Sequence, residues 1–136
     1  MSITLEQYFG PYCTHPDAGS GMYQAAESML ERVNALLDEA AADGVPIPAN
    51  PKTGSLVSGT ENGGFRPQAC STGAPKSSHK QARAVDVYDP EDALDAWVND
   101  AKLTKHGLYR EHPDDTPSWC HLSDKAPPSG RRTFKP

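Results

Sequence analysis

The stretch SSHKQARAVDVYDP, Ser77–Pro90, places a carboxylate inside an alternating apolar segment. Residues 82–88 alternate as a β-strand does, with two valines on one face and Asp86 on the other. The predicted face of Asp86 also carries Ala82, Ala84 and Tyr88. An ionised carboxylate in a half-buried strand is costly unless it is paired. Either this face is exposed, or another group requires the charge.

Two histidines can supply such a group. His79 lies in the segment just before the predicted strand, and His121 lies in a later stretch, SWCHLS. Alternation puts Trp119 and His121 on one face of that second strand and Cys120 on the other. Two imidazoles and one carboxylate suit zinc, and a catalytic zinc takes three protein ligands and leaves a fourth position for water.

Each of these three residues also has an ordinary structural role open to it. His79 can be a solvated loop residue, and His121 can be a core histidine with satisfied hydrogen bonds. Asp86 can form an ion pair with Arg83 or Arg66. Spacing alone does not choose between these roles and a metal site.

The remaining chain predicts one α+β domain over residues 1–136, an antiparallel sheet with flanking helices. A helix is expected from Ser20 or Gly21 to a stop at Gly44, because apolar residues recur on one helical face. They are Ala26, Met29, Leu30, Val33, Leu37 and Ala40. The stretch PEDALDAWVNDAKL predicts a second helix with Asp89 as its N-cap. Short strands are expected in LVS, FR, GLYRE, SWCHLS and the RRTFKP tail, and residues 1–20 and ACSTGAPKSS are expected to be loops.

Composition excludes some classes of protein. The net charge of -5 argues against a nucleic-acid binder, which would carry a basic face. No apolar run approaches the roughly 20 residues that span a bilayer, so no stable membrane association is expected. The start, MSITLEQYFG, lacks the basic and apolar parts of a secretory signal, which predicts a cytoplasmic protein as synthesised. Three cysteines without a C-x-x-C pair suggest buried thiols, with a Cys13–Cys70 disulfide as the alternative.

The pattern Ser77-x-His79-x-x-Ala82-x-Ala84-x-Asp86, followed by Trp119-x-His121, resembles the zinc D-Ala-D-Ala carboxypeptidases. That family belongs to the hedgehog/D-Ala-D-Ala/lysostaphin-type metallopeptidases, whose pattern reads Ser-x-His-x-x-Gly-x-Ala-x-Asp and then Trp-x-His or His-x-His. The resemblance extends through VSGTENGGFRP, GLYREHPDDTPSWCHL and SGRRTF, as in small phage and prophage cell-wall peptidases. It covers residues 22–134.

The resemblance implies a role for each matching residue. His79, Asp86 and His121 would be the ligands of Zn²⁺, and Ser77 would orient the loop or a ligand. Arg66 would bind a substrate carboxylate or polarise the scissile carbonyl, because a guanidinium matches a carboxylate with two hydrogen bonds. Trp119 would wall the site or serve as a plain core aromatic.

The chain departs from the family pattern at two positions. Ala82 stands where the motif has glycine, and its methyl group would fit on a strand face or crowd the cleft. Some relatives carry the general base three residues before the last histidine, where this chain has Ser118. The nearby acids are Glu111, Asp114 and Asp115. Glu111 is the expected base because hedgehog-type relatives end the neighbouring strand with a catalytic glutamate, and Asp115 is the alternative.

The resemblance implies a monomeric zinc peptidase that hydrolyses amide bonds of the peptidoglycan stem peptide. It would be a D-Ala-D-Ala carboxypeptidase or an endolysin-type endopeptidase that reaches the cell wall after release from the cytoplasm. The alternative is a catalytically inactive, zinc-containing module that binds the wall or belongs to a phage structure.

Overall fold

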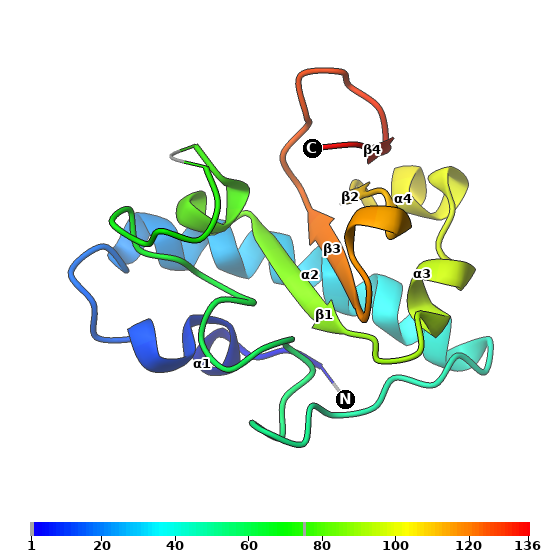
Figure 1. The fold of residues 1–136 in the computed structure, drawn as a ribbon, viewed down its shortest axis with the longest axis horizontal. Coiled ribbons are helices and arrows are strands. Elements are labelled where there is room, and N and C mark those ends of the chain that lie inside the picture. Colours follow the sequence, from blue (N-terminus) through cyan, green and yellow to red (C-terminus); the bar gives the residue numbers. More distant parts are fainter. Residues whose placement is uncertain (1, 75) are drawn as a thin grey trace.

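The computed structural model describes residues 2–74 and 76–136. Its central element is a four-stranded sheet made of β1 (Ala84–Tyr88), β2 (Tyr109–Glu111), β3 (Trp119–Ser123) and β4 (Thr133–Phe134). The strand order is β1-β3-β2-β4. Figure 1 shows β1 and β3 side by side in front of the long helix α2 (Ser20–Ala42).

The sheet is mixed, so the expectation of a purely antiparallel sheet was wrong. β3 runs antiparallel to both β1 and β2, whereas β4 pairs parallel to β2. The cause is the connection after β3, which reverses the chain and returns it along the far edge of β2. The expected edge strand in the tail is confirmed, although it is only two residues long.

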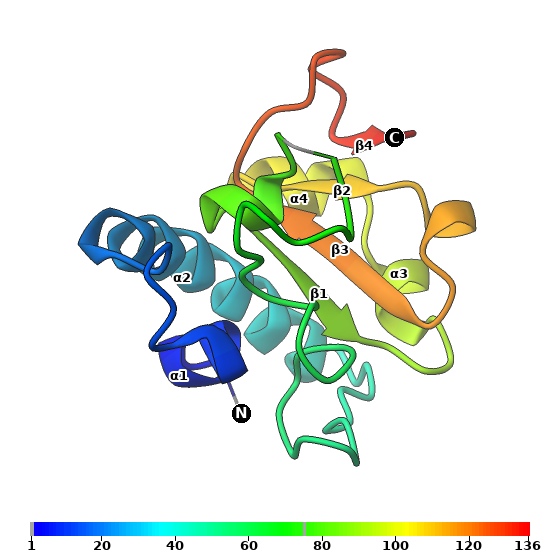
Figure 2. The same cartoon turned by 60° about the vertical axis from the view of Figure 1, so that its left-hand side comes forward.

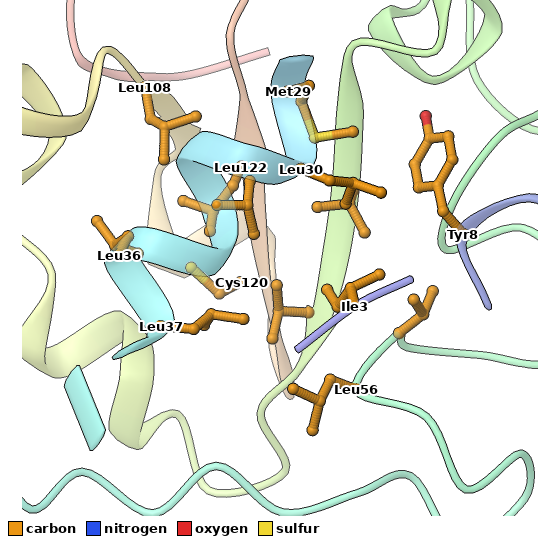
Figure 3. Close-up of a cluster of buried hydrophobic side chains, with 14 of the residues drawn as sticks. Ile3, Tyr8, Met29, Leu30, Leu36, Leu37, Leu56, Leu108, Cys120 and Leu122 are labelled. Atoms are coloured by element: carbon orange, nitrogen blue, oxygen red, sulfur yellow. The ribbon is translucent and has the colours of Figure 1, made fainter. Parts of the chain in front are cut away.

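One face of the sheet packs on α2. The apolar stripe predicted for this helix is buried in full, and Leu36 joins it. The side chains that meet it from the sheet include Val85, Val87, Cys120 and Leu122, all in one core cluster. Figure 3 shows Cys120 and Leu122 among Leu30, Leu36 and Leu37 of the helix. The opposite face of the sheet is therefore free to carry polar side chains.

The N-terminal segment holds helical structure where a loop was expected. α1 (Leu5–Phe9) begins with a capping box in which Thr4 and Gln7 bond each other's backbone amides, and the 3-10 helix η1 (Gly10–Tyr12) follows. Figure 2 shows α1 beside α2. Tyr8 and Phe9 are buried, so this segment forms part of the core.

The second predicted helix is two helices, α3 (Ala93–Trp97) and α4 (Asp100–His106). The break lies at Val98, which is extended, and at Asn99, whose side chain accepts the amide of Lys102 as a new N-cap. The N-cap residue of α3 is Asp92, so the expectation of Asp89 in that position was wrong. The Asp89 carboxylate nevertheless accepts the amides of Leu94 and Asp95 in the first turn.

Two further expectations were only partly right. The LVS and FR stretches are not strands in the structure; Val57 forms a single bridge to Val87. The loop expected at ACSTGAPKSS is confirmed for its first residues, but Ser78 begins the 3-10 helix η2 (Ser78–Gln81), and Pro75 lies outside the described residues. Within residues 2–74 and 76–136, no helix is long and apolar enough to cross a bilayer.

Candidate metal centre

The segment before β1 brings His79 to the sheet. Ser77 is the N-cap of η2, and its Oγ accepts the backbone amide of His79 at 3.3 Å. This contact agrees with the loop-orienting role expected of Ser77. η2 ends at Ala82, which adopts a left-handed conformation with φ 56° and ψ 35°. Ala82 therefore lies outside the strand, and its expected place on the strand face was wrong.

The left-handed turn at Ala82 gives a physical reason for the glycine in the family pattern. Glycine adopts positive φ without steric cost, whereas in alanine the Cβ atom makes this conformation less favourable. The Ala82 side chain is fully buried in the core cluster. Its methyl group therefore packs in the core, away from the polar face of the sheet.

The pairing of β1 with β3 sets Asp86 directly opposite His121. Nδ1 of His121 lies 2.9 Å from Oδ1 of Asp86, and Nε2 of His79 lies 3.2 Å from the same oxygen. All three residues are buried. The structure thus brings the three predicted ligands together, with one possible ligand atom from each inside a mutual spacing of 4.8 Å.

Hydrogen bonding fixes the orientation of the His79 ring. Its Nδ1 lies 2.8 Å from the carbonyl oxygen of Gly64, which can only accept a hydrogen bond. Nδ1 therefore carries a proton, and Nε2 is the ring nitrogen that points toward Asp86. A metal-binding histidine commonly has its second ring nitrogen held by a carbonyl in this way.

The electrostatics of the group favour an ionised carboxylate. Burial alone would raise the pKa of Asp86, but the adjacent charge of His79 and the hydrogen bonds from both histidines hold it well below its usual range. Asp86 also lies 3.4 Å from Nη2 of Arg66. The donor set of two imidazole nitrogens and one carboxylate oxygen fits zinc or a similar divalent transition metal.

Arg66 lies at the edge of this group. Its Nε donates to the carbonyl oxygen of Asn62 at 2.7 Å, and its Nη2 contacts Asp86. Together with Thr72, Asp86, Trp119 and the segment Ser58–Gly63, Arg66 lines a cleft of about 410 Å³. Trp119 is one of the residues that line this cleft.

Glu111 belongs to the same face of the sheet. The β2–β3 register pairs Tyr109 with Ser123 and Arg110 with Leu122, so its next step sets Glu111 beside His121. Burial would lower the pKa of His121, but its hydrogen bond to Asp86 raises it above the usual value, and the charge of Glu111 adds to that increase. Asp86, His121 and Glu111 therefore form one row across three strands.

Phe134 is a further member of this row that sequence reasoning did not place there. β4 pairs Phe134 with Glu111, and its ring stands edge-on to the His121 ring with centroids 6.3 Å apart. A two-residue edge strand has no alternation from which its facing could be predicted, so only the tertiary structure reveals the contact.

The other candidate acids lie outside the row. Asp115 belongs to the 3-10 helix η3 (Pro113–Asp115), and its carboxylate contacts Nζ of Lys135 at 3.3 Å. Asp114 is exposed. Ser118, in the position where some relatives carry the base, has φ 72° and donates its amide to Asp92.

A second group of acids, Asp89, Asp92 and Asp95, also converges within 4.8 Å. Its members already have structural partners. Asp89 accepts the amides of Leu94 and Asp95, Asp92 accepts the amide of Ser118, and Asp95 accepts from Arg110 and Thr116. These contacts account for the acids without a metal.

All three cysteines are free thiols, so the alternative of a Cys13–Cys70 disulfide was wrong. Cys120 is buried as expected, whereas Cys13 is exposed and Cys70 is half-buried. Comparisons of the chain with protein-family models, with curated proteins and with solved structures found no match.

Proposed function

We propose that this protein is a zinc-dependent peptidase that hydrolyses amide bonds of the peptidoglycan stem peptide. The observation that carries the proposal is the convergence of His79 Nε2 and His121 Nδ1 on Asp86 Oδ1, with Asp86 itself lining an open cleft. Three protein ligands beside a cleft suit a catalytic rather than a structural zinc, since structural sites are closed by a fourth protein ligand.

A bound zinc ion would supply a Lewis acid that makes hydroxide available near neutral pH. His79, Asp86 and His121 would hold it. The Gly64 carbonyl would keep the His79 ring in the tautomer that leaves Nε2 free to bind.

Glu111 would act as the general base. It would take the proton of the attacking water as the new C–O bond forms, and it would pass a proton to the amine as the C–N bond breaks. Support for this assignment comes from its place beside His121 in the row across β3 and β2. Asp115 is the weaker candidate because it lies outside this row, in η3, and its carboxylate faces Lys135.

Arg66 would position the substrate. Its guanidinium borders the cleft and is anchored on one side by the Asn62 carbonyl, which leaves other N–H groups to meet a substrate carboxylate or the developing oxyanion. Trp119 would form a wall of the same cleft.

The choice of stem peptide as substrate rests on the sequence resemblance. The test is incubation of the zinc-loaded protein with purified peptidoglycan and synthetic stem peptides, with products identified by mass spectrometry. Release of terminal D-alanine would indicate a carboxypeptidase, and internal cleavage would indicate an endopeptidase. Absence of any product from zinc-loaded, folded protein would contradict the proposal.

One observation favours an inactive, wall-binding module as the second candidate. Where some relatives carry the general base, Ser118 cannot accept a proton at neutral pH, and its amide is already bonded to Asp92. Stoichiometric zinc and binding to peptidoglycan without hydrolysis would select this alternative.

A further inference from the structure

A second hollow lies on the other side of the segment that borders the metal cleft. It has a volume of about 590 Å³ and is formed by the N-terminal helices α1 and η1 against residues 53–64. Five residues line both this groove and the metal cleft: Ser58, Gly59, Thr60, Glu61 and Gly63. The 58–63 loop is therefore a shared wall, and a peptide that crosses it would occupy both hollows.

The two ends of the 58–63 loop are hydrogen-bonded to the backbone of Asp86, a candidate metal ligand. The amide of Ser58 donates to the Asp86 carbonyl at 2.8 Å, and the Asp86 amide donates to the Gly63 carbonyl at 2.7 Å. A Cβ on Gly63 would lie 2.0 Å from the Ser58 carbonyl oxygen, so only glycine at this position allows the two ends of the loop to lie this close together. The loop thus has a fixed position relative to Asp86.

The groove side of the loop is also anchored. The Phe65 amide donates to the Tyr8 carbonyl at 3.2 Å, and the Tyr12 hydroxyl donates to Oδ1 of Asn62 at 3.0 Å. A Cβ on Gly64 would lie 2.0 Å from the Tyr8 carbonyl oxygen. These contacts hold the α1–η1 wall and the loop in one arrangement, so the groove is a built feature of the fold.

The charged residues that line the groove are acidic. Glu6 comes from α1 and Glu61 from the loop, and both are exposed. Among the described residues that line the groove, none is lysine, arginine or histidine. The metal cleft shares Glu61 as part of the common wall and also contains Asp86, but of the two hollows it alone is bordered by the Arg66 guanidinium. A ligand that spans the loop would meet Arg66 at one end, Glu61 at the loop and Glu6 at the other end.

We infer that the groove is a binding subsite for a primary ammonium group of a peptide that is held at the metal cleft. The complementary charges orient the peptide, with a carboxylate end toward Arg66 and an ammonium group toward Glu6 and Glu61. The ammonium belongs to a side chain or to the free N-terminus. The placing of the peptide rests on the proposed function, whereas the preference for an ammonium group rests on the groove alone.

Binding measurements test this inference without the need for hydrolysis. The probes are a synthetic stem pentapeptide that contains lysine, its Nε-acetyl form and its Nα-acetyl form. Their dissociation constants are measured by calorimetry for the zinc-loaded full chain and for its Glu111→Gln variant. Acetylation of the recognised amine is expected to weaken binding about two- to fivefold, the size of one or two exposed charge pairs. The acetyl form that loses affinity tells which amine is bound.

Glutamine variants test whether Glu6 and Glu61 cause the difference in affinity between the free and acetylated peptides. Glu61→Gln and Glu6→Gln are expected to reduce the difference between the free and acetylated peptides, and Glu27→Gln, at an exposed position of α2, is expected to preserve it. Equal affinity for all three peptides, or a preference that survives in the double variant Glu6→Gln/Glu61→Gln, would overturn the inference. If the protein distinguishes the free from the acetylated peptide but hydrolyses neither, the subsite is supported and the peptidase function is contradicted. If it hydrolyses the peptides but binds them equally, the peptidase function is supported and the subsite is contradicted.

Discussion

Asp86 and His121 are direct partners across β1 and β3, and Oδ1 of Asp86 lies 2.9 Å from Nδ1 of His121. Paired residues in an antiparallel sheet project from the same face, so the register itself brings the imidazole to the carboxylate. A slip of one residue would turn one of them toward the core. The candidate centre therefore depends on the sheet, and the apolar residues that alternate with these two positions hold that sheet on α2.

Replacement of Glu111 by glutamine is expected to leave zinc content unchanged and to lower kcat about 10²- to 10⁴-fold, because glutamine cannot accept the proton of water. Steady-state kinetics on a synthetic stem peptide, with zinc measured in the same samples, check this. Asp115→Asn is the matched comparison. Full activity in Glu111→Gln together with loss of activity in Asp115→Asn would transfer the role to Asp115.

Replacement of Arg66 by lysine is expected to lower kcat/KM about tenfold or more while zinc stays bound. Lysine keeps the charge but loses the planar fork that bonds both the Asn62 carbonyl and a substrate oxygen. Arg32→Lys is the control, because Arg32 is exposed on α2 and donates to the carbonyl of Gly107. Equal kinetics for the two variants would remove Arg66 from substrate binding.

Two substitutions of Ala82 are expected to separate the effects of backbone conformation and side-chain volume on the free energy of unfolding. Ala82→Gly relieves the left-handed conformation, worth about 1 kcal/mol, but loses a buried methyl group, worth about 0.8 kcal/mol. The free energy of unfolding should therefore change by less than about 1 kcal/mol. Ala82→Val should lose more than about 2 kcal/mol, because a β-branched residue tolerates positive φ poorly and the site is fully buried.

Urea unfolding of the two variants checks this expectation. The alternative is that the Ala82 methyl group crowds the cleft, in which case Ala82→Gly would raise kcat/KM with little change in stability. A stable Ala82→Val variant would show that the turn at Ala82 can relax.

The thiols are expected to react in order of exposure. Cys13 is exposed and should react with a disulfide reagent within seconds at pH 8, and the half-buried Cys70 should react more slowly. Burial, with Asp95 nearby, raises the pKa of Cys120 well above its ordinary value, so this thiol stays neutral and should react only when the protein unfolds. Rapid modification of three thiols in the folded protein would contradict the burial of the Cys120 side chain between β3 and α2.

Periodicity predicted the elements that bury one clear face. The apolar stripe of α2 and the alternation in β1 and β3 identified the core face of each. The other face of the two strands carries two of the three candidate ligands, Asp86 and His121, whereas His79 lies in η2. The α1 helix was missed although its signal, the Thr4–Gln7 capping box, was present in the sequence. The break between α3 and α4 was missed because Asn99 lies between two stretches of good helix formers.

The rest of the site depends on contacts between distant segments. Gly64 holds the His79 ring through a carbonyl group, which any residue type could supply. The Asn62 carbonyl that anchors Arg66 is equally independent of side-chain chemistry. Phe134 reaches His121 only because β4 returns along β2 in parallel. Backbone groups and short edge strands leave no pattern in the sequence, so these parts of the site required the structure.

Zinc stoichiometry tests the central claim most directly. The purified chain and the variants His79→Ala, His121→Ala and His15→Ala are dialysed against buffered micromolar zinc and assayed by mass spectrometry of the metal. His15 is the control because it lies near the N-terminus in contact with Asp17. We expect about one zinc per chain for the wild type and for His15→Ala, and little or none for the other two variants, which have lost one of three ligands. One zinc per chain in folded His79→Ala or His121→Ala would contradict this expectation.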